Sequence, residues 1–181
     1  MELITFKITG TSPLLMNNPV GMLNVKPDTL SAAKKIYDPN VEAQSRLYKD
    51  DKGFFLPSVA FRSAILSATS GKKVGKEKAI FVIPSSVQIA QENTYLVDKK
   101  GKSIQHYEID SRRVVVMKAG VIRHRPKFLE WQTYLPLLID TDRIPEDSVL
   151  TLLNDCGQKI GVGDYRPNKK GWFGMFKAEI E

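Results

Sequence analysis

The chain has 181 residues, 42% of them hydrophobic, and its 27 lysines and arginines exceed its 20 acidic residues, which gives a net charge of +7 and a pI of about 9.4. This length predicts a single domain, 1–181, with room for a hydrophobic core. No apolar run approaches the roughly 20 residues that span a bilayer, so we expect no membrane partner. The excess positive charge favours a polyanionic partner, although charge alone does not choose among RNA, DNA and a membrane surface.

The single cysteine and the amino terminus bear on the cellular compartment. Cys156 has no second cysteine to pair with, which excludes an internal disulfide and a cysteine-based zinc site and favours the reducing cytoplasm. We expect this side chain to be a small apolar residue on the inner face of a helix. The first residues alternate like a strand and lack the charged start and long apolar centre of a signal peptide.

The beginning of the chain predicts a strand followed by an insertion. In residues 2–9 every second side chain is apolar, which indicates a strand with one buried face. Residues 17–40 are interrupted by prolines and glycine and predict a long loop, with one or two helical turns at 29–37. A hairpin follows at 47–56 and turns at 50–53.

The middle of the chain predicts the first long helix and a second strand. Ser58 is a natural N-cap, and apolar residues recur at helical spacing through 58–70. Residues 71–78 form a basic linker that contains glycine. Residues 79–90 predict a strand, and a turn follows at 98–102.

The last part of the chain predicts a hairpin, two strands and a helix between them. Two apolar runs, 114–117 and 121–122, form the hairpin. Residues 130–140 form the strongest remaining strand. The helix at 146–156 begins with acidic residues that complement its dipole, and the chain ends in a strand at 172–180.

Without insertions at about 17–55 and 91–128, the order of elements is strand, helix, strand, strand, helix, strand. This order predicts an α+β fold with a ferredoxin-like (RRM-like) βαββαβ core. We expect both helices on one face of a single antiparallel sheet, whose four strands are 2–9, 80–90, 130–140 and 172–180.

A glycine-rich loop at 158–176 connects the last helix to the last strand. Its four glycines are Gly161, Gly163, Gly171 and Gly174. They surround Asp164, Tyr165, Arg166, Lys169, Lys170 and Trp172. The arginine and the two lysines supply charge for phosphates, and the two aromatic rings supply flat faces for bases. A plain structural turn would also use such glycines.

The glycine-rich loop resembles the signature of the RAMP superfamily, the ferredoxin-like RNA-binding proteins of CRISPR effector complexes. Residues 9–16, Thr-Gly-Thr-Ser-Pro-Leu-Leu-Met, and residues 53–65 are also similar to segments of that family. The chain departs from the family pattern at Val59 and Ser63, and it has Gly-Trp-Phe-Gly at 171–174 where Gly-x-Gly is common. The resemblance is closest to the backbone-subunit type and implies binding of single-stranded nucleic acid.

The densest group of basic residues lies at 110–127. On the predicted hairpin, one arm carries Arg112 and Arg113, and the other carries Arg123, His124, Arg125 and Lys127. Such a hairpin is suited to follow a nucleic-acid backbone. Charges that protect the edge of a sheet would give the same pattern. With Tyr165, Arg166, Lys169, Lys170 and Trp172, these arginines and Lys127 form the predicted binding surface, on which Tyr165 and Trp172 are stacking platforms.

Three functions remain open from the sequence. The first is a protein that binds single-stranded RNA or DNA and assembles along it. The second is a metal-independent endoribonuclease that processes CRISPR RNA, for which His124 is the weak catalytic candidate. The third is a basic structural protein. No Walker loop, nucleophile elbow, dinucleotide fingerprint or His-x-x-x-His pair occurs in the sequence, so we expect no cofactor and no metal. A phage genome and a CRISPR locus are both open as sources.

Self-assembly is predicted from residues 17–40 and the methionine before them. This segment has more apolar residues than a solvated loop: Met16, Met22, Leu23, Val25, Leu30 and Ile36. These residues must pack either on their own domain or on a neighbouring subunit. We favour the neighbouring subunit, because methionine and leucine on an arm suit an adaptable interface.

Overall fold

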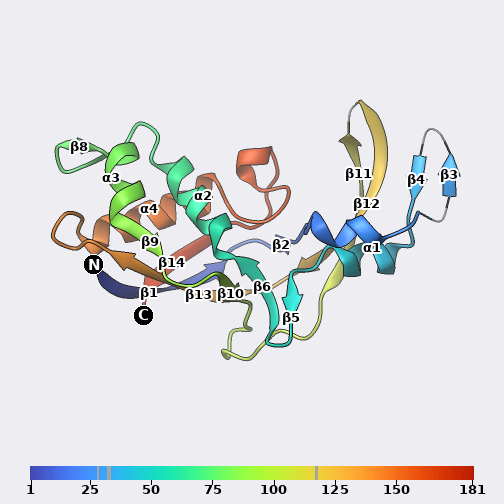
Figure 1. Ribbon diagram of the computed structural model, residues 1–181, viewed down its shortest axis with the longest axis horizontal. Helices are drawn as coiled ribbons and strands as arrows, with labels where there is room; N and C mark the ends of the chain where they lie inside the picture. Colours follow the sequence, from blue (N-terminus) through green and yellow to red (C-terminus); the bar gives the residue numbers. More distant parts are fainter. Residues whose placement is uncertain (28, 32–33, 117) are drawn as a thin grey trace.

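The computed structural model describes residues 1–27, 29–31, 34–116 and 118–181. The protein is elongated, and one end holds a four-stranded antiparallel sheet with helices packed on it (Figure 1). At the other end a long hairpin and a short helix extend away from the sheet, and the glycine-rich loop lies between the two parts (Figure 1). The protein is a mixed α and β structure with antiparallel sheets, in keeping with the predicted α+β class.

The central sheet has the strand order β14-β1-β13-β9, and all its neighbouring strands are antiparallel. Its strands are β1 (Glu2–Gly10), β9 (Val87–Ile89), β13 (Gln132–Ile139) and β14 (Phe176–Ile180). Side chains alternate along a strand, so Phe6 and Ile8 of β1 are fully buried whereas Leu3 is 63% exposed on the other face. The strands predicted at 2–9 and 130–140 are confirmed.

Helices cover one face of this sheet (Figure 1), namely α2 (Ser58–Ala68), α3 (Ala79–Ser86) and α4 (Glu146–Lys159). Both predicted helices are confirmed as α2 and α4, which contact each other. Helix α2 begins differently from the prediction, because Pro57 is its N-cap and Ser58 is its first residue. In α4 the side chain of Cys156 is buried as expected, and this burial raises the pKa of its thiol to about 12.

The predicted strand at 79–90 is wrong over most of its length, because residues 79–86 form helix α3 and only Val87–Ile89 is extended. The buried residues of α3 repeat at helical spacing: Ala79, Val82, Ile83 and Ser86. A short apolar run fits a helix and a strand equally well by periodicity, so tertiary packing decides. Pro84 removes one helical hydrogen bond, and the helix ends soon after it.

The first insertion folds into small elements beside the long hairpin: η1 (Val20–Asn24), β3 (Thr29–Ser31), β4 (Lys34–Ile36) and α1 (Pro39–Ser45). The helical turns predicted at 29–37 are wrong, because β3 and β4 pair antiparallel with Thr29 opposite Ile36. Both of these residues are β-branched, which favours a strand. Helix α1 starts where the carboxylate of Asp38 accepts hydrogen bonds from two backbone amides, and it contacts β12.

Short strands complete the part next to the sheet: β5 (Lys49–Asp50), β6 (Gly53–Pro57), β7 (Lys73–Val74), β8 (Glu77–Lys78) and β10 (Asn93–Tyr95). The hairpin predicted at 47–56 is confirmed by the pairing of β5 with β6. The basic linker at 71–78 contains the small hairpin of β7 and β8. The turn at 98–102 is confirmed, because the carboxylate of Asp98 accepts hydrogen bonds from the amides of Lys100 and Lys102.

The predicted basic hairpin is confirmed as β11 (Glu108–Val116) and β12 (Ala119–Phe128). Its register places Arg112 opposite Arg123 and Asp110 opposite Arg125. The base of the hairpin pairs with β2 (Leu14–Leu15), which follows β1 along the chain. The hairpin is thereby tied to the sheet end of the molecule.

The last strand starts later than predicted, at Phe176 rather than residue 172. Gly174 has a φ of +65°, which interrupts an extended chain. The preceding loop contains one short helical turn, η2 (Pro167–Lys169).

Candidate nucleic-acid interface

Close backbone approaches shape the glycine-rich loop. Gly163 has a φ of +76°, and a Cβ there would lie 2.5 Å from the carbonyl oxygen of Leu15. A Cβ at Gly171 would lie 1.7 Å from the carbonyl oxygen of Tyr165. These positions therefore require glycine. A positive φ is also found at the other two predicted loop glycines, Gly161 and Gly174.

Backbone hydrogen bonds attach this loop to the start of the chain. The amide of Asp164 donates to the carbonyl of Leu15 at 2.9 Å, and the amide of Gly174 donates to that of Pro13 at 2.8 Å. Inside the loop, the amide of Val162 donates to the carbonyl of Gly174 at 2.9 Å. The side chains of the loop are therefore held on a well-supported backbone.

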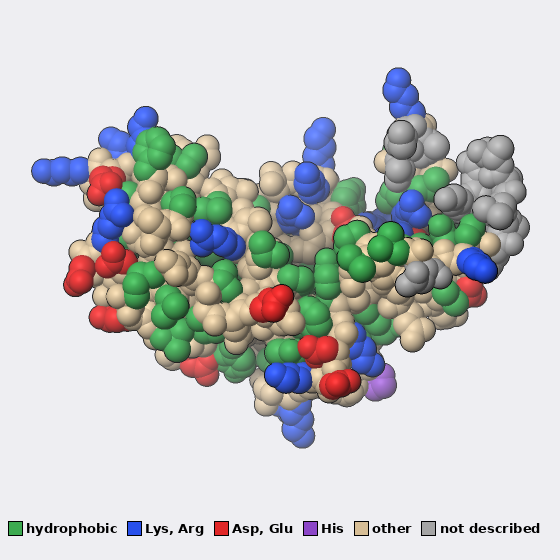
Figure 2. Space-filling model, viewed as in Figure 1, with side chains coloured by type: hydrophobic (Ala, Val, Ile, Leu, Met, Phe, Trp, Pro, Cys, Tyr) green, Lys and Arg blue, Asp and Glu red, His purple; other side chains and the backbone are tan. Residues whose placement is uncertain are grey.

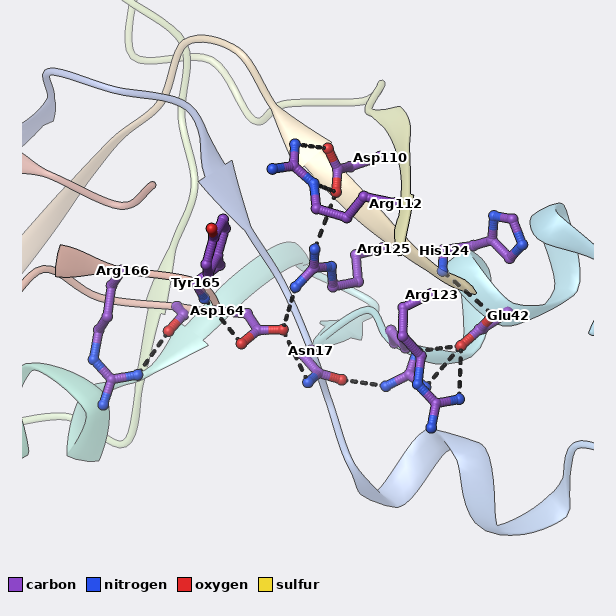
Figure 3. Close-up of polar contacts among 12 residues, drawn as sticks. Asn17, Glu42, Asp110, Arg112, Arg123, His124, Arg125, Asp164, Tyr165 and Arg166 are labelled. Atoms are coloured by element: carbon purple, nitrogen blue, oxygen red, sulfur yellow. Dashed lines mark hydrogen bonds and ion pairs between the residues drawn. The ribbon is translucent and has the colours of Figure 1, made fainter. Parts of the chain in front are cut away.

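Asp164 connects the glycine-rich loop to the hairpin and to the segment that follows β2 (Figure 3). Its Oδ2 accepts hydrogen bonds from Arg125 Nη1 at 2.8 Å and from Asn17 Nδ2 at 3.1 Å. Its Oδ1 accepts one from the amide of Tyr165 at 2.9 Å. One carboxylate thus fixes three segments that are far apart in the sequence.

A second carboxylate, Asp110, holds two arginines of the hairpin. Arg125 donates to Asp110 Oδ2 at 3.2 Å, and Arg112 donates to it through Nε at 2.7 Å and to Oδ1 through Nη2. Hydrogen bonding to the carboxylate of Asp110 raises the pKa of Arg112 above its usual value. Arg125 is only 4% exposed and lies between two carboxylates, so its charge is already compensated inside the protein.

A third carboxylate, the fully buried Glu42 of α1, holds helix and hairpin together (Figure 3). Its Oε1 accepts hydrogen bonds from Arg46 at 3.1 and 2.8 Å and from Arg123 at 3.5 Å. Its Oε2 accepts one from the amide of His124 at 3.3 Å. Arg46 also donates to Asn17, and Asn17 donates to Asp164, so the polar network is continuous from α1 to the glycine-rich loop.

A groove of about 570 Å³ lies between the hairpin and the glycine-rich loop. Figure 2 shows this hollow with Lys and Arg side chains on both of its sides. Its basic lining residues are Arg46, Arg112, Arg113, Arg123, Arg125, Arg166 and Lys169. Among the lining residues that the structure describes, Asp164 is the single acid. We refer to this hollow as the basic groove.

The cations of the basic groove fall into two kinds. Four of them contact carboxylates: Arg46, Arg112, Arg123 and Arg125. Across residues 1–27, 29–31, 34–116 and 118–181, no carboxylate lies within ion-pair distance of Arg113, Arg166 or Lys169. The uncompensated charge of the groove therefore comes from these three side chains.

Aromatic rings continue the basic groove along the glycine-rich loop. The guanidinium of Arg112 lies 4.8 Å from the ring centre of Phe173 and 5.6 Å from that of Tyr165. Trp172 is 53% exposed, and its ring centre lies 4.4 Å from that of Phe173. Tyr165 has a φ of +48°, a backbone conformation that is costly for a non-glycine residue and that recurs at binding sites.

Most of the predicted binding residues come together in the basic groove: Arg112, Arg113, Arg123, Arg125, Tyr165, Arg166 and Lys169. Lys127, Lys170 and Trp172 do not line it, and Lys127 forms an ion pair with Glu108 at 2.7 Å. The imidazole of His124 lies outside the groove and contacts the hydroxyl of Ser111 at 2.7 Å.

Sequence reasoning did not predict the structural role of the carboxylates and the amide that organise this groove: Glu42, Asp110, Asp164 and Asn17. A carboxylate inside a basic segment, such as Asp110 and Asp164, is a usable sequence signal. Glu42 and Arg46 have the i,i+4 spacing of a helical ion pair. Their link to the hairpin depends on tertiary contacts that no local pattern contains.

No protein-family model matches this chain, and no curated protein matches it. Throughout the portion of the chain that the structure describes, no helix is long and apolar enough to cross a membrane. In that same portion, no group of three His, Cys, Asp or Glu side chains is placed to hold a metal ion.

Proposed function

We propose that the basic groove binds single-stranded nucleic acid. The observation that carries the proposal is the placement of Arg113, Arg166 and Lys169, without carboxylate partners, around one hollow. Each such cation can neutralise a phosphate and release a counterion. Tyr165 and Trp172, next to this charge, offer ring faces on which unpaired bases stack, and this favours a single strand over a duplex.

We further infer that the chain is a cytoplasmic relative of the RAMP backbone subunits with a ferredoxin-like core. The sheet order β14-β1-β13-β9, with α2 before β9 and α4 before β14, supports the βαββαβ arrangement. The glycine-rich loop between α4 and β14 supports the resemblance to that family. In this proposal α3 is an addition to the core.

The test is binding of labelled RNA and DNA oligonucleotides over a range of salt concentrations. Replacing Arg113 and Lys169 together with alanine is expected to weaken binding to all sequences alike. It should also lower the slope of log affinity against log salt by about 1.4, because a single strand contributes about 0.7 per phosphate contact.

The matched control replaces Lys73 and Lys76, two exposed lysines of the β7–β8 hairpin. Both double variants have the same net charge, so the control should bind like the original protein. Equal losses in the two variants would show that only net charge matters, and unchanged binding in the Arg113 and Lys169 variant would reject the groove as the interface.

The other two functions give different outcomes in the same experiment. An endoribonuclease would cleave RNA and leave the 2′-deoxy analogue intact, and a basic structural protein would bind neither. We favour binding over cleavage because the His124 imidazole lies outside the basic groove and contacts Ser111.

We also propose that copies of the protein assemble along the strand. Part of the segment expected to reach a neighbour instead contacts its own chain, because Met16 is fully buried and Met22 accepts a hydrogen bond from Ser45 at 2.8 Å. Leu23 is 78% exposed on η1 and remains available to a second copy. The same prediction included Leu30 and Ile36, whose side chains are not among those that the structure describes.

A further inference from the structure

A second hollow of about 320 Å³ lies beside the basic groove and is unlike it in character. Much of its wall is apolar and comes from Met16, Tyr48, Leu56, Val59, Ala60 and Val162. We refer to this hollow as the side pocket. An apolar wall with an aromatic ring suits the flat face of a nucleobase better than it suits a phosphate.

The side pocket and the basic groove share part of their walls. Both hollows are lined by Asn17, Asp164 and Arg166, and Figure 3 shows Asp164 between the other two. A strand whose phosphates occupy the basic groove therefore passes the mouth of the side pocket. A base of that strand reaches the pocket by turning away from its neighbours, as in proteins that read extruded bases.

The polar groups at this mouth have unused hydrogen-bonding capacity. Arg166 donates one N–H to the carbonyl of Gly163 at 2.9 Å, and its guanidinium has five donors in total. Asp164 accepts three hydrogen bonds, from Arg125, Asn17 and the Tyr165 amide, out of about four that a carboxylate can accept. The mouth therefore offers a fork of donors and one acceptor.

We propose that the side pocket binds one base of the bound strand and prefers guanine. Guanine has two neighbouring acceptors, O6 and N7, which fit the donor fork of an arginine. It also has an N–H donor for the remaining acceptor site of Asp164. Adenine has an amino donor where guanine has the acceptor O6. This amino group would face the N–H donors of Arg166, which is unfavourable. This inference rests on the proposed binding of a single strand in the basic groove.

The experiment uses short uridine tracts that carry one central guanosine, adenosine, 7-deazaguanosine or abasic residue. The guanosine strand should bind about tenfold more tightly than the abasic strand, in the range of one bidentate base contact. The 7-deaza strand, which lacks N7, should lose most of this advantage. The adenosine strand should bind more weakly than the guanosine strand.

Two variants locate the effect in the side pocket. Val59 is 63% exposed at the rim, so Val59→Trp fills the pocket without straining the core, and it should bring the guanosine-to-abasic affinity ratio close to one. Arg166→Lys keeps the charge but removes the fork, so it should abolish the preference for guanosine over adenosine. Ile80→Trp, at a 52% exposed position of α3, is the control and should keep both ratios.

The outcomes separate this inference from the function on which it rests. Tract binding with equal affinity for the guanosine and abasic strands would overturn the side pocket and leave the basic groove intact. Absence of binding to every strand would overturn both. An unchanged guanosine preference in Val59→Trp, with the variant shown to be folded by its thermal transition, would move the base contact out of this pocket.

Discussion

In the proposed interface, Arg125 is a basic residue that would act without touching the nucleic acid. Its guanidinium is buried between Asp110 and Asp164, and it joins the hairpin to the glycine-rich loop. We therefore regard Arg125 as a residue that positions the exposed cations. In the proposed function, the phosphates would contact side chains such as Arg113 and Lys169, which line the same groove.

Replacing Arg125 with methionine should lower the free energy of unfolding by about 3–5 kcal/mol, because Asp110 and Asp164 each lose their ion pair with this buried arginine. The measurement is urea unfolding of the variant beside the original protein. Adding Asp110→Asn should recover part of the loss, since Asp110 is only 7% exposed and its charge would be compensated by Arg112 alone. If the free energy of unfolding fell by less than about 1 kcal/mol, the ion pairs of Arg125 would contribute no more than solvent-exposed surface pairs do.

At the scale of elements, the shape of the glycine-rich loop depends on the close approach of Gly171 to the backbone of Tyr165. Gly171→Ala places a Cβ against the carbonyl of Tyr165, so the backbone must shift, at a cost of about 3 kcal/mol. The expected result is a lower melting temperature together with weaker oligonucleotide binding, because Tyr165 and Arg166 move with the loop.

The control for this change is Gly75→Ala in the β7–β8 turn. Gly75 has a φ of +58° but no neighbouring atom within 4 Å of an added Cβ, so only backbone strain of about 1–2 kcal/mol is expected. This variant should keep its affinity for oligonucleotides. If the Gly171→Ala protein were as stable as the original and bound oligonucleotides equally well, the loop would tolerate a wider distance between Gly171 and the carbonyl of Tyr165.

The sequence was most informative where the local pattern and the tertiary environment agree. The strand at 2–9 alternates and buries Phe6 and Ile8, and α2 buries the face that its spacing predicts. It was least informative at α3, where a continuous apolar run fits a strand or a helix equally well.

At the interface, the sequence identified the exposed charges better than their arrangement. The basic hairpin and the glycine-rich loop were predicted separately from local composition. The hairpin and the loop face one groove because two carboxylates hold arginines of the hairpin. Asp164 binds Arg125, which is 39 residues away in the chain, and Glu42 binds Arg123, which is 81 residues away. Contacts of such sequence separation leave no periodic signal.

At the scale of the whole molecule, the basic groove is short compared with a nucleic-acid strand, so assembly would add affinity by joining copies. Leu23→Glu should abolish the growth of complexes with increasing oligonucleotide length and leave binding to the shortest strands unchanged. Mass measurement across a length series tests this. Leu129→Glu, at a 53% exposed position after β12, is the control and should assemble normally. Identical growth in both variants would remove η1 from the assembly contact.

The buried ion pairs of Arg125 have a consequence for handling the protein. Mobile ions screen exposed charges over about 10 Å at 0.1 M salt, but they hardly reach a pair enclosed by protein. Concentrated salt should therefore detach a bound strand while the hairpin and the glycine-rich loop keep their places. Dilution then restores a surface that is already in its binding shape, so release and reloading form a reversible cycle that involves no refolding.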